Sequence, residues 1–327
     1  MKTMFTTVKT EDQIQGAMAL FNGCTAAGET LFKPMRTVQE FSDFFLVRKD
    51  GVQTVCLSDG GDGCFASGCL SEDKTKGYIT YLAVRKDLRR QGVGTGLLKA
   101  LEAALCSMAD QKLTCFEATF FNPMNFVWIV PGTKDHEHPN APGVDVAGGG
   151  YLFLKNVGYR DYAVQNAYHL NLQSYQLTDA MERKKQDLSL KGIQITTYDP
   201  AVHTGLEELL RDLDNDLWYR EITQTVADEN GAPLLIVDWN GRAMGFTGPL
   251  KVQENGRGYL AGVGVHSECR GMGVGKVMFG ELCVQLKALG ARYMTLFTGE
   301  TNPARNIYEA QGFKIVRTWA DMRKIVR

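Results

Sequence analysis

Two short glycine-rich clusters contain the residues of this sequence with the clearest chemical use. One reads Arg89-Arg-Gln-Gly-Val-Gly94 and the other Arg270-Gly-Met-Gly-Val-Gly275. Glycines adopt positive φ angles and let the backbone approach a ligand closely. If a helix begins at each cluster, its free N–H groups and its dipole converge on one point and favour an anion. The arginines add positive charge, so each cluster is a candidate pyrophosphate site.

Two well-known phosphate motifs do not fit these clusters. A P-loop requires Gly-x4-Gly-Lys-Ser/Thr, but Arg270 stands at the first glycine and Val277 replaces the hydroxyl residue. A dinucleotide fingerprint requires Gly-x-Gly-x-x-Gly, but Gly92, Gly94 and Gly96 have the wrong third spacing. This spacing argues against a nucleotide-dependent oxidoreductase. On these residues alone, a tight turn before a helix, without a ligand, remains open.

A second group of chemically capable residues lies within residues 124–150. His136 and His138 stand beside residues of metal-ligating types, which are Asp135, Glu137 and Asp145. No cysteine or distant histidine completes the set at a known spacing, so we expect no metal. The aromatic and proline-rich content indicates an ordered loop that contacts substrate or another domain, or is plain surface. The eight cysteines form no CxxC pair, which favours buried, reduced thiols.

The two glycine clusters belong to an internal repeat. Tyr78 falls on Tyr259 at an offset of 181 residues (259 − 78), and Gly158 falls on Gly312 at an offset of 154 (312 − 158). Asn122 falls on Asn302 at an offset of 180 (302 − 122), so the offset drops by 26 (180 − 154) after that point. The first copy therefore carries about 26 extra residues, which we place within 124–150.

Similar elements are expected around each cluster. A strand pattern precedes it, an amphipathic helix follows, and a further strand comes next. Helical spacing of apolar residues extends from Leu97 to Met108 and from Val277 to Leu289, and Gly290 suits the C′ position. The expected strands are 77–84, 112–120, 258–265 and 292–297, and the expected hairpins are 53–57 with 63–70 and 233–238 with 244–252.

The connection between the two copies is also predicted. The pattern indicates a strand at 163–172, a charged helix at 177–191, a strand at 193–198 and a helix at 201–219. We therefore expect a first domain over 1–172, a linker helix over 173–191 and a second domain over 192–327.

Length and charge limit the class of protein. A chain of 327 residues suits two domains. Its 36 basic and 37 acidic side chains leave a net charge of -1, which argues against nucleic acid as the main partner. No apolar run approaches the ~20 residues of a membrane span, and the N-terminus has no signal-peptide core. We expect a cytoplasmic protein with neither nucleic-acid nor membrane partners.

The repeated motifs resemble those of a known superfamily. Leu82-Ala-Val84-x4-Arg89-Arg-Gln-Gly-Val-Gly94 is similar to the acetyl-CoA motif of the GCN5-related N-acetyltransferases (GNAT), and Val263-Gly-Val265-x4-Arg270-Gly-Met-Gly-Val-Gly275 is similar to it again. Thr301-Asn-Pro-Ala-Arg-Asn-Ile-Tyr-Glu-Ala-Gln-Gly-Phe313 resembles the family's second motif. The resemblance implies an α/β protein of two tandem GNAT-like domains, similar in arrangement to mycothiol synthase. Each domain would have a mostly antiparallel central sheet flanked by helices.

The resemblance also implies acetyl-CoA as the cofactor and a set of contacts to it. Pantetheine would pair with Val263 and Val265 in the second copy and with Leu82 and Val84 in the first, and Asn302 would contact CoA. The turn amides would bind the pyrophosphate. The turn residues are Arg270, Gly271, Met272, Gly273, Val274, Gly275 and Lys276, and in the first copy Arg89, Arg90, Gln91, Gly92, Val93, Gly94 and Thr95.

The same resemblance assigns catalytic roles. Tyr308 matches the family's general acid near the CoA sulfur, whereas the first copy has Leu154 at that position. We therefore expect the second domain to be active and the first to be degenerate, with CoA binding by the first left open. Many relatives carry a glutamate where this chain has Tyr259 and, in the first copy, Tyr78. The base is thus a bound water, Glu300 or a residue of the other domain, and Tyr259 would orient the amine or water.

The function implied is transfer of an acetyl group from acetyl-CoA to a primary amine of a small molecule or peptide. A non-catalytic acyl-CoA-binding or sensor protein is the alternative, because the expected base is missing. The acceptor amine and the oligomeric state are not indicated by any motif.

Overall fold

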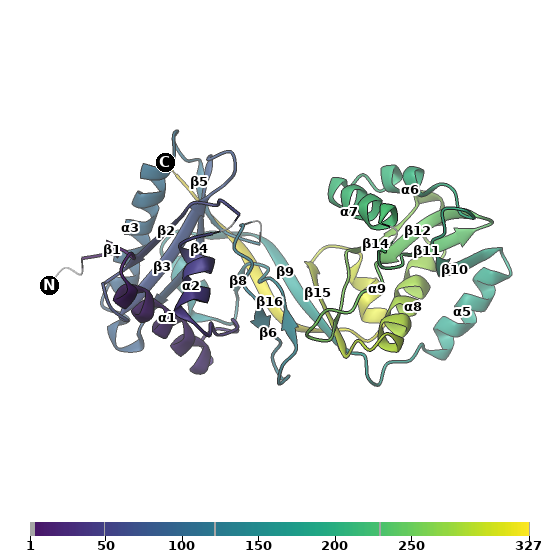
Figure 1. Cartoon of the computed structure of the whole chain (residues 1–327), viewed down its shortest axis with the longest axis horizontal. Coiled ribbons are helices and arrows are strands. Elements are labelled where there is room, and N and C mark those ends of the chain that lie inside the picture. The colour runs from purple at the N-terminus through teal and green to yellow at the C-terminus, as the bar shows by residue number, and fades with distance from the viewer. Residues whose placement is uncertain (1–3, 49, 121, 229, 327) are drawn as a thin grey trace. The chain divides into compact units, whose positions relative to one another are not determined.

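The computed structural model describes residues 4–48, 50–120, 122–228 and 230–326. The chain forms two compact units (Figure 1). The first unit contains Met1–Asn166 together with Arg317–Arg327, and the second contains Ala167–Val316. Two long strands, β9 (Arg160–Asn171) and β16 (Lys314–Ile325), pass through these boundaries.

The first unit is built on a sheet with helices on both faces (Figure 1). Its strand order is β1 (Thr6–Thr7), β2 (Thr54–Ser58), β3 (Cys64–Leu70), β4 (Lys76–Val84), β5 (Cys115–Ala118) and then the end of β16. One face is covered by α1 (Glu11–Ala26) and α2 (Val38–Phe45), and the other by α3 (Val93–Met108) and α4 (Gly149–Asn156). Alternation along β3 sends Phe65 towards the first helix pair and Ala66 towards the second.

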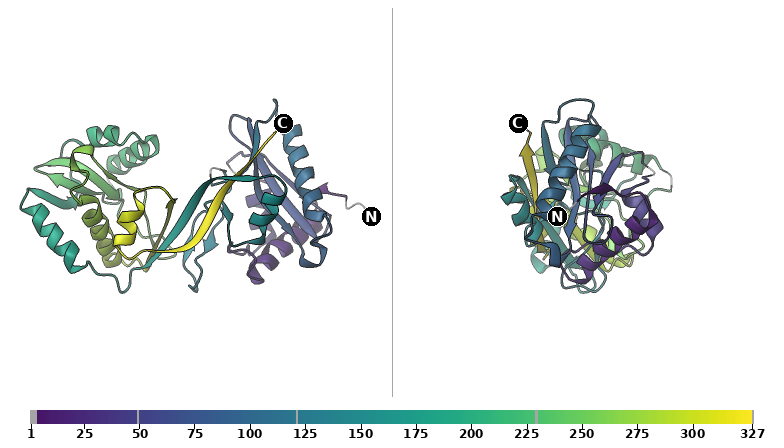
Figure 2. Two further views of the ribbon diagram at one scale, coloured as in Figure 1. Left: turned by 180° about the vertical axis from the view of Figure 1, so that it is seen from behind. Right: turned by 90° about the vertical axis from the view of Figure 1, so that its left-hand side faces the viewer.

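The second unit has a four-stranded antiparallel sheet in the order β10 (Ile193–Thr197), β11 (Leu235–Trp239), β12 (Arg242–Gly248) and β14 (Gly262–Val265). A parallel pair, β13 (Arg257–Gly258) and β15 (Tyr293–Gly299), lies next to β9. One face packs against α5 (Asp179–Ser189), α8 (Val274–Ala288) and α9 (Arg305–Ala310), and the other against α6 (Leu206–Asp212) and α7 (Asp216–Ala227). Figure 2 shows α9, in yellow, beside α8.

Most of the expected elements are present. Both hairpins form, as β2 with β3 and as β11 with β12. The turn between β11 and β12 has Asn240 at φ 53° and Gly241 at φ 85°, the positive angles that a type I′ turn requires. Gly290 follows the C-cap of α8 with φ 93°, as expected for C′.

Two expected elements are each divided in two. The helix expected over 201–219 is interrupted between α6 and α7 because Asp214 has φ 49° and the Asn215 side chain caps α7. The strand expected over 258–265 is divided because β13 pairs with β15, whereas β14 pairs with β12. This second division creates the opening described below.

The unit boundaries differ from the expected division at 172 and 192. Residues 317–327 belong to the first unit because the end of β16 pairs with β5, with Met322 opposite Ala118. Without this strand β5 would present an open edge. The second unit begins at Ala167, within β9.

The insertion within 124–150 forms short strands and ends in α4. β6 (Trp128–Ile129) pairs with β7 (Glu137–His138), and β8 (Val144–Asp145) pairs with β16. Trp128 is fully buried, stacks on His138 and meets the Trp319 ring edge-on. Among the described residues, no group of three or more His, Cys, Asp or Glu could hold a metal ion. None of the described helices is long and apolar enough to cross a membrane.

Candidate functional site

The second unit has an open strand edge that leads to a helix N-terminus. β13 and β15 pair only at Arg257 with Tyr293 and at Gly258 with Met294. From Gly262 onward the strand pairs with β12, and no described pairing joins β14 to β15. The two strands therefore separate at residues 259–261 and leave one edge of β14 free.

The backbone alternation directs the expected pantetheine positions towards this free edge. The N–H of His266 donates to the Met244 carbonyl at 2.9 Å, which fixes the phase of the β12–β14 ladder. In an antiparallel ladder the polar groups point alternately to either side. Gly262 and Gly264 therefore face β12, and the N–H and C=O groups of Val263 and Val265 point to the free edge.

The first unit repeats this arrangement. β4 pairs with β5 only over Lys76–Tyr78, so its remaining length has a free edge. The Arg85 N–H donates to the Gly63 carbonyl at 2.8 Å, at the position equivalent to His266. The same alternation points the N–H and C=O groups of Leu82 and Val84 to the free edge.

Each glycine cluster forms the expected turn into a helix. Gly92 (φ 83°) is the N-cap of α3 and Gly273 (φ 82°) is the N-cap of α8. Two residues earlier the first copy places Arg90 at φ 63°, where the second has Gly271 at φ 79°. The first N–H groups of a helix have no partner within it, so both turns present donors to an anion.

The last glycine of each cluster brings the helix start close to its neighbours. A Cβ on Gly275 would lie 3.2 Å from Val265 and 3.3 Å from Ile307 of α9. A Cβ on Gly94 would lie 3.6 Å from Val84 and 3.5 Å from Phe153 of α4. The strand end, the turn and the second-motif helix thus converge in both units.

The cluster arginines hold the turns together. Arg89 Nε donates to the Val84 carbonyl at 2.7 Å, and its terminal nitrogens contact the Glu29 carboxylate at 2.9 and 2.5 Å. These bonds hold the pKa of Glu29 below its usual value. Arg270 Nε donates to the Val265 carbonyl at 3.4 Å, and a terminal nitrogen lies 3.7 Å from Asp212. Both guanidinium groups therefore act mainly as structural ties between strand and turn.

Positive charge at the second turn comes from two lysines. Lys276 is exposed on the first turn of α8. Lys184 of α5 passes over the turn, with its Cε 3.1 Å from the position of a Cβ on Gly273. The sequence analysis missed Lys184, which lies about 90 residues before the turn it covers. In the first unit nothing lies within 4 Å of a Cβ placed on Gly92.

The other residues of the two turns have mainly structural positions. The Met272 N–H donates to the Cys269 carbonyl at 3.3 Å, and Val274 is buried at the start of α8. Gln91 Nε2 donates to the Asp87 carbonyl at 2.7 Å and closes the first turn. Val93 and Thr95 are half-buried in the first turn of α3.

Tyr308 lies on α9 in a cluster of aromatic rings. Its ring is 7% exposed and lies 5.1 Å from Phe279 and 6.0 Å from Tyr168, measured between ring centroids. Within the described part of the chain, its hydroxyl forms no hydrogen bond to another side chain. Burial, with the nearby Tyr168, raises the pKa of Tyr308 to about 12. Val263 packs against the same cluster.

The first unit has no hydroxyl at the equivalent place. The Phe313 N–H donates to the Tyr308 carbonyl at 3.3 Å, and the Tyr159 N–H donates to the Leu154 carbonyl at 3.0 Å. Both helices end at a glycine of positive φ, Gly312 and Gly158. Leu154 therefore occupies the position of Tyr308 and can donate no proton.

Asn302 shapes the start of the α9 segment. Its Oδ1 accepts the Ala304 N–H at 2.9 Å, as Asn122 Oδ1 accepts the Met124 N–H at 2.8 Å in the first unit. The oxygen of Asn302 is thus used locally, and its exposed amide nitrogen is left for a ligand.

Tyr259 is joined to a carboxylate that the motifs do not reveal. Its hydroxyl donates to Glu221 Oε1 of α7. Burial and this carboxylate raise the pKa of Tyr259 to about 12. Gly258 is the last residue of β13 that pairs with β15, and Tyr259 follows it directly. The Tyr259–Glu221 pair therefore lies at the point where the strands separate. Glu221 lies 38 residues before its partner (259 − 221), so no local spacing could have indicated it.

Glu300, a candidate base in the sequence, lies elsewhere. It is exposed beyond the end of β15, six residues after Met294, which pairs with Gly258. At about 3.3 Å per residue, Glu300 lies about 20 Å along the strand from Met294, the last residue that pairs with β13. Of these carboxylates, Glu221 is the one placed at the opening.

Comparison with known protein families bears on this arrangement. A family model described as "Acetyltransferase (GNAT) family" matches residues 25–119 and 200–313, one match in each unit. These matches cover more than half of the chain. The chain belongs to the GNAT acetyltransferase family. Family membership supports acyl transfer as its general activity and small-molecule or peptide acceptors as its class of partner. No curated protein matches the chain.

Solved GNAT structures share the fold over the whole chain. One is the glucosamine N-acetyltransferase region of a fungal multi-domain GH3 β-N-acetylglucosaminidase, with TM-score 0.64 and 18% identity over 98% of this chain and 38% of that one. A GNAT protein from Sphaerobacter thermophilus has TM-score 0.62 and 16% identity, covering 99% and 96%. A tandem GNAT protein of the clavulanic acid pathway has TM-score 0.56 and 16% identity, covering 98% of each. The predicted tandem GNAT arrangement is confirmed.

Proposed function

We propose that the second unit transfers an acetyl group from acetyl-CoA to a primary amine of a small molecule or peptide. The observation that carries this proposal is the free edge of β14, which connects the α8 N-terminus with the Tyr259–Glu221 pair. Tyr308 packs beside this edge through the cluster that includes Val263. The name of the fungal relative, a glucosamine N-acetyltransferase region, agrees with an amine acceptor.

The residues around the edge fit an acyl-CoA ligand. The N–H groups of Gly271 and of residues 273–276, with the ammonium groups of Lys184 and Lys276, would hold the pyrophosphate. Val263 and Val265 would pair with pantetheine, and the Asn302 amide nitrogen would contact CoA nearby. The strand measures about 13 Å from Val265 to residue 261. An extended pantetheine chain can span this length and reach the point where the strands separate.

Acetyl-CoA supplies the thioester carbonyl that the amine attacks. The Val263 N–H at the free edge would polarise this carbonyl. A C–N bond forms, the C–S bond breaks, and Tyr308 acts as general acid towards the leaving sulfur. Because the pKa of Tyr308, about 12, lies above the ~8.5 of a thiol, its main contribution is a hydrogen bond to the developing thiolate. The amine loses one proton, which Glu221, with Tyr259 as its orienting partner, would accept directly or through water.

The first unit suits a non-catalytic role. Leu154 replaces the acid, and Arg89 is tied to Glu29. Its free edge at Leu82 and Val84 and its turn still resemble an acyl-CoA site, which favours a binding or structural partner of the second unit.

The test is release of free thiol from acetyl-CoA with a panel of amines. Tyr308→Phe should lower kcat by about 10²-fold, the lower end of the range for a general acid. Glu221→Gln should reduce kcat/KM for the amine while acetyl-CoA binding is kept. Tyr168→Phe removes a hydroxyl from the same ring cluster and should leave kcat nearly unchanged.

Two results would contradict this function. If acetyl-CoA binds but no amine is acetylated and Tyr308→Phe has no effect, the protein is an acyl-CoA sensor. If NAD rather than acetyl-CoA raises the melting temperature, the acyl-CoA site itself is wrong.

A further inference from the structure

The indole ring of Trp218 lies against the strand edge at which the proposed function places the thioester. Trp218 belongs to α7 and is half-buried. Its Nε1 donates to the Ala261 carbonyl at 3.2 Å. A Cβ on Gly262, the residue before Val263, would lie 2.5 Å from two ring atoms and 2.8 Å from a third. The ring therefore rests directly on the backbone of residues 261 and 262.

Several contacts hold this ring in place. The ring meets that of Phe246 edge-on, at 5.5 Å between ring centroids, and Phe246 is fully buried. The Asn215 side chain, at the N-cap of α7, accepts the Trp218 N–H at 3.0 Å. Trp218 also packs against the buried cluster that includes Ile222 of the same helix. Because both the backbone and the ring are tied, the indole forms a fixed wall beside the free edge of β14.

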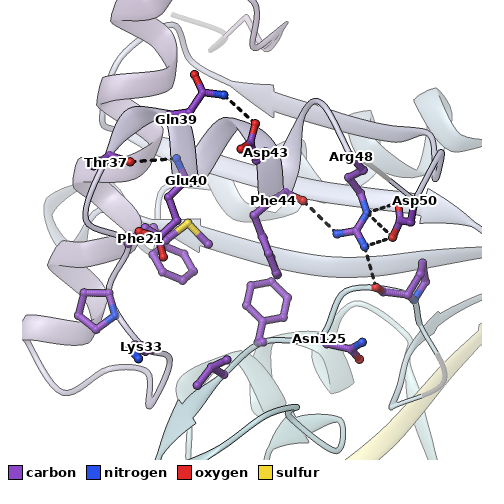
Figure 3. A pocket seen from close by; sticks show the side chains of 15 residues that line it. Phe21, Lys33, Thr37, Gln39, Glu40, Asp43, Phe44, Arg48, Asp50 and Asn125 are labelled. Atoms are coloured by element: carbon purple, nitrogen blue, oxygen red, sulfur yellow. Dashed lines mark hydrogen bonds and ion pairs between the residues drawn. The ribbon is translucent and has the colours of Figure 1, made fainter. Parts of the chain in front are cut away.

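The first unit supplies an aromatic ring to the equivalent place from its strand. Tyr81 stands at the position of Gly262 at the repeat offset of 181 (262 − 81), and it is buried among the rings of α1 and α2. Thr37, the N-cap of α2, accepts the Glu40 N–H at 3.0 Å, so Glu40 has the helix position of Trp218 (Figure 3). In the second unit the strand residue is instead a glycine, and the ring comes from the helix.

The two faces of β14 indicate where each part of the thioester would lie. The carbonyl oxygen would point to the Val263 N–H at the free edge. The Val263 side chain packs in the cluster of Tyr308, on the face that α8 and α9 cover, so the sulfur would lie towards that face. A Cβ on Gly262 points to the other face, where α7 holds Trp218. Since sulfur and acyl chain lie on opposite sides of a planar carbonyl group, the acyl chain would point towards Trp218.

We propose that Trp218 restricts the acyl group of the second unit to acetyl or propionyl. This inference rests on the function proposed above and adds the residue that selects the donor. A carbonyl carbon at the Val263 N–H lies about 3.3 Å of strand from Gly262, on which the ring rests. A short acyl group ends before the ring, whereas further methylene groups meet a wall that moves only if α7 moves. Each such methylene should cost about tenfold or more in kcat/KM.

The test compares donors of increasing acyl length, with the whole chain and one amine. Thiol release gives kcat/KM for acetyl-, propionyl-, butyryl- and hexanoyl-CoA, and hexanoyl-CoA should be at least about 100-fold poorer than acetyl-CoA. Trp218→Ala should raise the ratio of hexanoyl to acetyl at least about tenfold, and Trp218→Phe, which keeps most of the volume, by a smaller factor. Trp239→Ala is the matched control, because Trp239 is also half-buried but packs on the face that α5 and α8 cover. It should leave the ratio unchanged.

A second measurement locates the acyl group without turnover. Replacing the four tryptophans by 5-fluorotryptophan gives fluorine NMR signals that single Trp→Phe variants assign. The signal of Trp218 should differ between the CoA and acetyl-CoA complexes, because only the second carries an acyl group near the ring. The signal of Trp239 should be the same in both complexes.

The outcomes separate this inference from the transfer function. If the Trp218 signal distinguishes acetyl-CoA from CoA but no amine is acetylated, the transfer function fails and the acyl wall stands; the ratio of dissociation constants then replaces that of kcat/KM. A Trp218 signal that is the same in both complexes would overturn the proposal. So would a donor preference in Trp218→Phe and folded Trp218→Ala that equals that of Trp239→Ala, or a change in preference among amines without one among donors.

Discussion

A single side chain distinguishes the chemistry expected of the two units. Tyr308 and Leu154 lie near the ends of equivalent helices and accept the same backbone hydrogen bond at their carbonyls, and each precedes a glycine of positive φ by four residues. The backbone at Tyr308 therefore has the same local structure as the backbone at Leu154, and of these two positions only Tyr308 carries a hydroxyl. The environment of that hydroxyl, apolar and beside a second tyrosine, decides how it titrates.

The pH dependence of turnover should reflect this environment. Burial raises the pKa of Tyr308 to about 12, so the hydroxyl stays protonated to higher pH than an ordinary tyrosine near 10. We expect kcat to rise as the acceptor amine loses its proton and then not to fall up to about pH 10. A profile of kcat against pH tests this expectation. A fall with an apparent pKa near or below 10 would contradict it, unless the same fall occurs in Tyr308→Phe.

Residues in short motifs were predictable, whereas tertiary partners were not. The turn glycines form a pattern that local geometry explains, and Val263 and Tyr308 belong to motifs that resemble those of the family, so the sequence indicates where these residues lie. Glu221 and Lys184 reach the site from α7 and α5, and nothing near them in the sequence marks them. The partner of Arg89, Glu29, lies 60 residues away and was equally hidden.

At the scale of elements, small residues in β14 set where α6 and α7 lie. A Cβ on Gly262 would lie 2.5 Å from the Trp218 ring, and one on Gly264 would lie 2.4 Å from Leu213. Trp218 Nε1 also donates to the Ala261 carbonyl at 3.2 Å. Because Glu221 stands one turn after Trp218 on α7, this contact also positions the Tyr259–Glu221 pair.

Gly262→Ala should therefore affect both stability and catalysis. The new methyl group overlaps the Trp218 ring, so we expect a loss of about 1–3 kcal/mol in the free energy of unfolding of the second unit. Displacement of α7 should also lower kcat/KM for the amine more than the affinity for acetyl-CoA. Urea unfolding and steady-state kinetics measure the two effects.

The matched control is Gly149→Ala at the start of α4, where no atom lies within 4 Å of the new Cβ. It should be neutral or slightly stabilising. If Gly262→Ala is as stable as this control, Trp218 does not hold α7 against the strand.

At the scale of the whole molecule, the chain's last strand belongs with its first unit. Trp319, Ala320 and Met322 are buried there, and Asp321 accepts hydrogen bonds from Thr119 Oγ1 and the Phe120 N–H. The internal repeat predicted two copies of one fold. The helices and strands of each copy could be predicted because local sequence patterns determine them. The final strand, at 314–325, was not among the elements expected from the sequence, and no local feature indicates that its end pairs with β5.

Met322→Ala should therefore destabilise the first unit although it lies at the other end of the sequence. Met322 is fully buried opposite Ala118, so truncation leaves a cavity, with an expected cost of about 2–5 kcal/mol in the first unit's free energy of unfolding. Limited proteolysis with fragments mapped by mass should show cuts within 1–166 at lower temperature than in the unaltered chain, while acetyl transfer persists. Met322→Leu, which nearly conserves volume, should change little. Earlier cleavage within 167–316 and loss of transfer would instead assign the strand's stabilising role to the second unit.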